Sequence, residues 1–158
     1  MRAPIVVLGG AVLLLAACGG HRRVEIDPEG EQVGSRWNAA LATPAALAGA
    51  MQVRGRGWWG EQRGEPTRSQ AHVEITNAVP GGDHPWHVHE GQCGSNGPIV
   101  GPATAYRSLE VDKNGRASAT ADLPIAMPRT GQYHVNVHAS ANNLGTIIAC
   151  GNLAPPIR

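Results

Sequence analysis

Three histidines at two places in the chain have the residue type and spacing of a metal site. His87 and His89 are two residues apart, and a strand points side chains with that spacing to the same face. His138 ends a second run of alternating apolar residues, so a neighbouring strand could supply a third imidazole nitrogen. Three neutral imidazoles favour copper or zinc, and Cu(II) binds most tightly in the Irving–Williams order. The spacing alone leaves open an ordinary pair of surface histidines.

A fourth ligand matters because three nitrogens suit trigonal Cu(I), whereas Cu(II) prefers a tetragonal set. His134 lies four residues before His138 and therefore on the same face of the expected strand. It is a candidate fourth ligand, and the alternative is a solvent-exposed strand histidine. Glu90 directly follows His89, so its side chain is expected on the opposite face.

The segments that would position these histidines have the patterns of short strands. They alternate apolar with polar residues or are rich in β-branched residues, and Gly, Pro, Asn and Asp separate them. These segments are residues 51–59, 72–76, 86–89, 109–111, 117–123 and 133–138. The Ala-rich stretch 37–50 has helical propensity, but Pro44 interrupts it. The pattern predicts an all-β domain, either a sandwich or a Greek-key barrel, with the tryptophans packed in the barrel or at its end.

One turn is predicted in detail. Asn114 and Gly115 lie between two of the expected strands, and Asn-Gly is the strongest short-range signal of a hairpin. A tight type I′ turn needs positive φ at both central residues, and Asn and Gly tolerate it best.

Composition limits the classes of partner. The chain has 158 residues, enough for one domain, with 13 basic and 12 acidic side chains and a formal net charge of +1. No surplus of positive charge is left to bind nucleic acid or an anionic surface electrostatically. The 21 Gly and 12 Pro also favour a turn-rich β domain over a helical bundle.

The N-terminus predicts export and anchoring. Residues 1–17 form a signal-like apolar run that is too short to span a bilayer permanently. The run ends in Leu-Ala-Ala before Cys18, which resembles the lipobox of bacterial lipoproteins, and this implies cleavage before Cys18 and lipidation of its sulfur. Residues 18–36 lack periodicity and are expected to be a tether. The lipid would hold the protein on the extracytoplasmic side of a membrane, and Gly19 suggests the outer membrane, facing the periplasm, if the cell has one.

Several blocks of the domain resemble the copper/zinc superoxide dismutase family. The resemblance spans roughly residues 37–153 and includes a His-x-x-His-Val-His-Glu block, a later Val-His followed by Leu-Gly, and a terminal Ala-Cys-Gly. The blocks are residues 83–91, Cys93, residues 97–98, residues 137–145 and residues 149–151. It implies that residues 37–158 form an eight-stranded Greek-key β-barrel.

The resemblance also implies roles for particular residues. His87, His89 and His138 match copper ligands of the family. His84 matches a histidine that orients the ligand strands through backbone hydrogen bonds, and such support tunes a metal site. The two remaining cysteines match the family's intrachain disulfide, which would pair Cys93 with Cys150.

The chain departs from the family in ways that remove the zinc site. Ile99 occupies the position of the histidine that bridges copper and zinc, and the loop with the other zinc ligands is missing. Asn142 replaces the acidic residue that links the two metals. Ile147 replaces the arginine that attracts the anion over the copper. Copper is therefore expected as the cofactor, and zinc is not.

Two functions follow from the resemblance and its gaps. One is dismutation of superoxide to H₂O₂ and O₂, made slow by the missing bridging histidine, zinc ligands and arginine. The other is a non-enzymatic protein of the cell envelope that binds, buffers or delivers copper. A scaffold kept only for partner binding is a third alternative.

Overall fold

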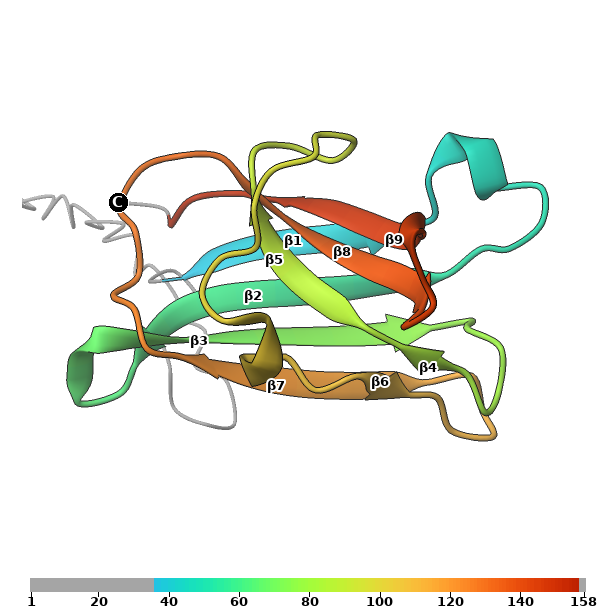
Figure 1. Ribbon diagram of the computed structural model, residues 1–158, viewed down its shortest axis with the longest axis horizontal. Coiled ribbons are helices and arrows are strands. Elements are labelled where there is room, and N and C mark those ends of the chain that lie inside the picture. Colours follow the sequence, from blue (N-terminus) through green and yellow to red (C-terminus); the bar gives the residue numbers. More distant parts are fainter. Residues whose placement is uncertain (1–35, 157–158) are drawn as a thin grey trace, which may run out of the picture.

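The computed structural model describes residues 36–156, which form an almost all-β domain (Figure 1). The predicted signal peptide, Cys18 and the tether up to residue 35 lie outside the described residues. The strands are β1 Trp37–Ala42, β2 Arg54–Gln62, β3 Glu65–Thr76, β4 Asp83–His84, β5 Trp86–Glu90, β6 Leu109–Glu110, β7 Ala117–Leu123, β8 Tyr133–Ser140 and β9 Asn143–Leu153. Two short 3-10 turns, η2 Ala45–Leu47 and η3 Ala103–Ala105, lie between strands. The prediction of an all-β domain is confirmed.

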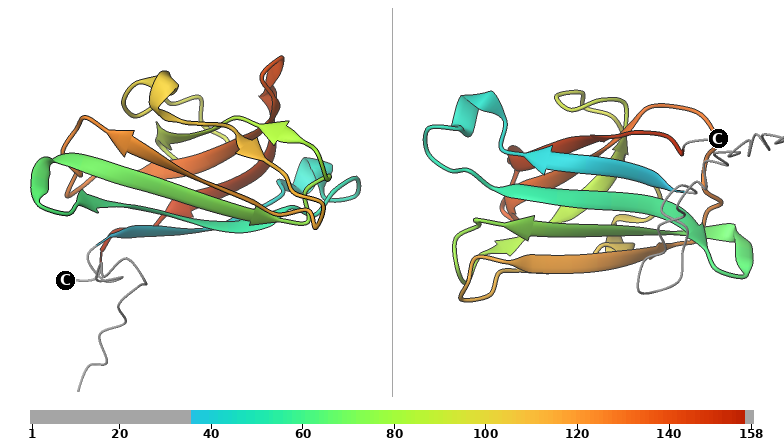
Figure 2. Two further views of the ribbon diagram at one scale, coloured as in Figure 1. Left: turned by 90° about the horizontal axis from the view of Figure 1, so that it is seen from below. Right: turned by 180° about the vertical axis from the view of Figure 1, so that it is seen from behind.

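Seven of the strands form one curled antiparallel sheet. Their order is β5-β8-β9-β1-β2-β3-β7, so strands far apart in the sequence are neighbours at the β9–β1 and β3–β7 boundaries. The sheet curls until its β5–β8–β9 end lies over its β2–β3–β7 end, which gives a half-barrel (Figures 1 and 2). The short pair β4–β6 forms a second sheet, in which β4 contacts β8 and β6 contacts β7.

Alternating side chains fill the inside of the curl. In β1 the buried residues are Trp37, Ala39 and Leu41, with exposed residues between them, as a half-buried strand requires. Trp37 and Trp59 meet the ring of Tyr133 edge-on, with centroids 5.3 and 5.0 Å apart. These large rings supply core volume in a chain that has no Phe.

The Ala-rich stretch 37–50 forms β1 and η2, so its helical propensity is not realised. Packing explains this result, because a period of two buries Trp37, Ala39 and Leu41 in one core and a helix would not. No helix among residues 36–156 is long and apolar enough to cross a membrane.

The turn at Asn114 and Gly115 differs from the predicted type I′ hairpin. Gly115 has a φ of 74°, but Asn114 is not among the residues with positive φ. The Asp112 side chain accepts hydrogen bonds from the backbone N–H groups of Asn114 and Arg116, both at 2.8 Å, and this fixes the turn without an αL asparagine. The flanking strands then pair elsewhere, β6 with β4 and β7 with β3.

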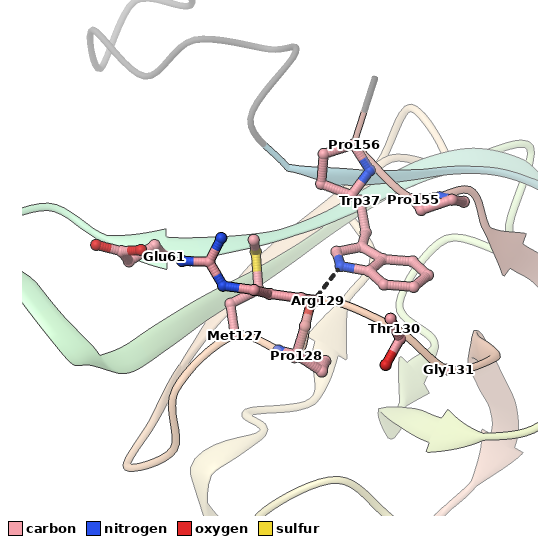
Figure 3. A pocket seen from close by; sticks show the side chains of 9 residues that line it. All are labelled: Trp37, Glu61, Met127, Pro128, Arg129, Thr130, Gly131, Pro155 and Pro156. Atoms are coloured by element: carbon pink, nitrogen blue, oxygen red, sulfur yellow. Dashed lines mark hydrogen bonds between the residues drawn. The ribbon is translucent and has the colours of Figure 1, made fainter. Parts of the chain in front are cut away.

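Both ends of the described chain lie at one end of the half-barrel. Asn38 and Ala154 exchange backbone hydrogen bonds there. Trp37 lines a pocket of about 700 Å³ beside Pro155 and Pro156, and its indole N–H donates to the Pro128 carbonyl at 3.0 Å (Figure 3). This pocket lies near the Tyr133 end of β8, away from His138 at the other end of the strand.

The adjacent tryptophans of β2 give a test of the strand register. Trp59 is 1% exposed and donates its indole N–H to Ser69 Oγ. Trp58 is half-buried on the outer face of the sheet, where it stacks on His72, and so does not pack inside the barrel as Trp37 and Trp59 do. Trp59→Ala should lower the free energy of unfolding by about 3–5 kcal/mol, because it leaves a large cavity and an unpaired hydroxyl. Trp58→Ala is the control and should cost about 1 kcal/mol or less in urea unfolding. Equal losses would contradict the register.

Candidate metal centre

Strand pairing brings the three predicted histidines together. β5 pairs with β8 in a register that sets His87 opposite Asn136 and His89 opposite His134, so all four side chains share the outer face of the sheet. His138 lies two residues beyond Asn136 on that same face. One ligand atom each of His87, His89 and His138 lies within 4.8 Å of the others, and His87 Nδ1 is 3.1 Å from His138 Nε2. Among residues 36–156 this is the one group of three or more His, Cys, Asp or Glu with such spacing.

Backbone carbonyls fix which nitrogen of each ring faces the cluster. The Nδ1–H of His89 donates to the Gly97 carbonyl at 2.9 Å, and that of His138 donates to the Leu144 carbonyl at 2.6 Å. A carbonyl only accepts, so both Nδ1 atoms carry the proton and both Nε2 atoms carry a lone pair. The Nε2 of His138 accepts a hydrogen bond from His87 Nδ1–H in the metal-free protein. His89 Nε2 is buried and has no hydrogen-bond partner among the described residues. The site therefore offers Nε2 from His89 and His138 and Nδ1 from His87, oriented as metal-binding histidines are.

His84 lies outside the cluster and acts on it through the backbone. Its Nδ1–H donates to the carbonyls of His138 and Ala139, at 3.1 and 2.9 Å. The His138 N–H also donates to the Pro85 carbonyl at 2.8 Å. These bonds join the segment before β5 to the end of β8. They therefore fix the backbone of His138 relative to His87 and His89 on β5.

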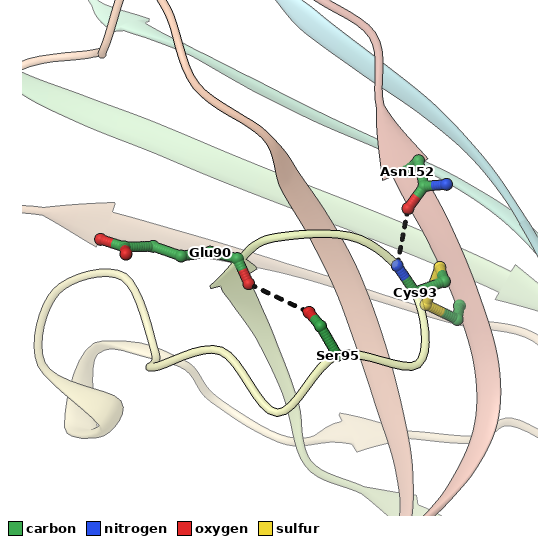
Figure 4. Close-up of a disulfide and its surroundings, with 5 residues drawn as sticks. Glu90, Cys93, Ser95 and Asn152 are labelled. Carbon is green, nitrogen blue, oxygen red and sulfur yellow. Dashed lines mark hydrogen bonds between the residues drawn. A yellow bond between two sulfur atoms is a disulfide. The ribbon is translucent and has the colours of Figure 1, made fainter.

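A disulfide holds the loop that orients His89. Cys93 and Cys150 are bonded, with their Cα atoms 6.0 Å apart, so the predicted pair is confirmed (Figure 4). The Cys93 N–H donates to Asn152 Oδ1 at 2.7 Å, which adds a second link between this loop and β9. The loop then returns toward the end of β5, and a Cβ at Gly97 would overlap the Glu90 carbonyl oxygen. Only glycine allows the approach that brings the Gly97 carbonyl to His89.

The cluster opens into a hollow of about 480 Å³, whose lining is part polar and part apolar and includes no Asp, Glu, Lys or Arg. Ile99, Leu144 and Ile147 lie around it, and Ile99 pairs with His89 through an isolated β-bridge. The other residues that line it are His87, His89, Gly94, Ser95, Asn96, Gly97, Asn136, His138 and Gly145. Of the described residues around the hollow, none is Asp, Glu, Lys or Arg. The lining of the hollow therefore contributes no formal charge from these residue types.

His134, the candidate fourth ligand, does not join the group of three. Its ring stacks on that of His89, with centroids 5.4 Å apart and planes inclined by 20°. The ring is fully buried, so the alternative of a solvent-exposed strand histidine is wrong. Burial lowers the pKa of His134, which keeps the ring neutral beside the ligands.

Two rings of the cluster, those of His87 and His138, have lowered pKa values. Burial, followed by the neighbouring His138 and His89 rings, lowers the pKa of His87 from 6.5 to about 4. Burial also lowers the pKa of His138, although the hydrogen bond to Leu144 opposes that shift. The lowered pKa values keep the His87 and His138 rings neutral at neutral pH, so a metal ion need not displace an extra proton from either ring.

Two neighbours of the site were missed by sequence reasoning. Tyr106 is buried against His87, with ring centroids 5.3 Å apart, and its hydroxyl donates to the Val100 carbonyl at 2.7 Å. Asn136 is 7% exposed and lies between His87 and Cys150 across three strands. The sequence does indicate where the Asn136 side chain lies, since a strand residue two positions before His138 shares its face. Tyr106 comes from a connecting segment whose path the sequence does not reveal.

Comparison with known proteins adds no family assignment. No protein-family model matches this chain, and no curated protein matches it either.

Removal of the disulfide should weaken both the fold and the site. A chain with Cys93→Ser and Cys150→Ser should lose about 4 kcal/mol of unfolding free energy. The disulfide joins two residues 57 positions apart, and without it the unfolded chain gains conformational entropy. Affinity for Cu²⁺ should also fall by about tenfold, since the loop no longer holds the Gly97 carbonyl on His89. Urea unfolding and titration against a competing chelator measure the two effects.

The matched control for this pair is Ser95→Ala. It changes the same loop and leaves the disulfide intact, so both quantities should stay near the wild-type values. Full Cu²⁺ affinity in the double serine variant would show that the loop does not orient the site.

Proposed function

We propose that this chain binds one copper ion at His87, His89 and His138, as a zinc-free relative of the copper/zinc superoxide dismutases. The observation that carries the proposal is the convergence of three imidazole nitrogens within 4.8 Å, two of them oriented by backbone carbonyls. Three neutral nitrogen donors with no carboxylate suit copper, which binds such sites more tightly than the other first-row divalent ions.

The topology supports the family proposal. Strands distant in sequence lie side by side at the β9–β1 and β3–β7 boundaries, as Greek-key connections require. The β4–β6 pair, which contacts β8 on one side and β7 on the other, lies where an eight-stranded barrel would close. The histidines on the outer face of β5 and β8, the disulfide and the contacts of His84 support the same proposal.

The proposal leaves zinc out because of the residues beside the copper ligands. Ile99, at the position of the family's bridging histidine, lines the hollow and offers no donor atom. The segment after it passes through η3 to β6 and contributes no histidine, as the sequence shows.

Bound copper would supply one-electron redox chemistry or a transferable ion, and the chain's own residues hold and shield it. The three histidines bind it, Gly97 and Leu144 orient two of the rings, and the buried sheet face below excludes water. The hollow leaves one side of the cluster accessible to a small molecule.

Copper buffering or delivery is the first candidate function, and the uncharged lining of the hollow favours it. A charge-lined cleft can raise the encounter rate of an anion by about 10–10³, and this hollow offers no such field. Slow superoxide dismutation is the second candidate, and the open side of the cluster favours it because O₂⁻ is small enough to enter. Superoxide is then the substrate.

The location we propose is the extracytoplasmic side of a bacterial membrane. The lipobox-like residues up to Cys18 support a lipid anchor, with the tether leading to the domain. The disulfide supports the same compartment, because structural disulfides persist where conditions are oxidising.

The test is a paired measurement of copper content and superoxide decay on the purified protein. We expect one copper per chain, its loss in His138→Ala, and its retention in His72→Ala, a histidine of the opposite sheet end that stacks on Trp58. Superoxide decay should be close to that of unfolded, copper-loaded chain. Ile147→Arg, which adds a cation at the hollow, should raise the rate about tenfold.

Each result separates the candidates. Copper binding that survives His138→Ala would reject the site. Fast superoxide decay by the wild type would favour an enzyme over a copper buffer. If Ile147→Arg then left that rate unchanged, the absence of charge in the hollow would not be what limits it.

A further inference from the structure

Asn136 carries a buried acceptor that the fold does not use. The residue is 7% exposed, and its Oδ1 has no hydrogen-bond partner among the described residues. Buried acceptors are almost always paired, because an unpaired one loses its hydration without compensation. Asparagine is also depleted in strands, where an apolar residue would pack at less cost. The side chain therefore weakens the metal-free protein at its position.

The position of Asn136 connects this acceptor to the copper site. It lies in the middle of β8, opposite His87 of β5 on one side and Cys150 of β9 on the other. It lines the same hollow as the three ligand histidines and shares their face of the sheet. The apolar residues of that hollow, Ile99 and Ile147 among them, offer no side-chain acceptor.

Cu(I) and Cu(II) prefer different numbers of ligands. Three imidazoles satisfy Cu(I), whereas Cu(II) prefers at least one further ligand. His134 does not belong to the ligand group, and the lining has no carboxylate among the described residues. A water molecule in the hollow is then the available further ligand, and a water polarised by a cation is a strong hydrogen-bond donor.

We propose that Asn136 positions the fourth ligand of the site: its Oδ1 accepts a hydrogen bond from the water that completes the coordination of Cu(II). The inference rests on the proposed function. Its consequence is selectivity between oxidation states, because Asn136 stabilises the Cu(II) form and leaves the three-coordinate Cu(I) form unaffected. Asn136 thus favours one oxidation state of the bound copper, and the histidines supply the ligands that both oxidation states share.

The test compares Asn136→Leu with the wild type in three measurements. In the metal-free protein the urea midpoint should rise, because an unpaired buried acceptor is replaced by an apolar side chain of similar size. Cu(II) affinity should fall about tenfold and Cu(I) affinity should change less than about twofold. The reduction potential of the bound copper should then rise by about 59 mV, the one-electron equivalent of a tenfold change.

Two further variants complete the design. Asn136→Asp keeps an acceptor oxygen at the same position and should bind Cu(II) at least as tightly as the wild type. Asn38→Leu changes an exposed asparagine of the same sheet, on β1, and should leave both copper affinities unchanged.

The outcomes separate this inference from the proposed function. If the wild type binds one copper and Asn136→Leu leaves the ratio of Cu(II) to Cu(I) affinity unchanged, Asn136 has no role in coordination and the copper site stands. If Asn136→Leu lowers the urea midpoint and both affinities together, Asn136 is a structural residue and the inference is wrong. If the wild type binds no copper in either state, the proposed function fails and the inference fails with it.

Discussion

The antiparallel pairing of β5 with β8 is the interaction on which the rest of the site depends. Its register assigns Trp86, Val88, Val135 and Val137 to the core, where each is fully buried, and the histidines to the opposite face. A slip of one residue would exchange the two faces, which would place imidazoles in the apolar core and move tryptophan and valine out of it. The apolar core face therefore determines where the ligands lie, because the free energy of its burial is what holds the register.

The loops that cover the outer face of the sheet bury the histidines there and make a metal site possible. The residues 134–138 of β8 are all buried, since the core covers one face and the disulfide-held loop and the β8–β9 end cover the other. Burial lowers the pKa of His87 and of His138 and so keeps these two rings neutral, and it leaves the ring N–H groups in need of acceptors from the protein. The carbonyls of Gly97 and Leu144 take that role, so the loops that exclude water also orient the ligands.

Part of this arrangement could be predicted from the sequence. The period of a strand placed His87 and His89 on one face, and the alternating run before His138 placed it on a neighbouring strand; the structure agrees on both. The burial of His134 and of Asn136 could not be predicted, although the strand period does place Asn136 on the histidine face, because burial there depends on a loop that returns over the sheet. Cys93 and Cys150 were paired only through a family resemblance, since spacing does not identify partners among three cysteines.

The most direct test of the central claim is X-ray diffraction at the copper absorption edge from crystals of the copper-loaded protein. The account predicts one anomalous peak per chain, bonded to Nδ1 of His87 and to Nε2 of His89 and His138. A peak at another histidine such as His72, or bonding through different nitrogens of the three rings, would contradict it.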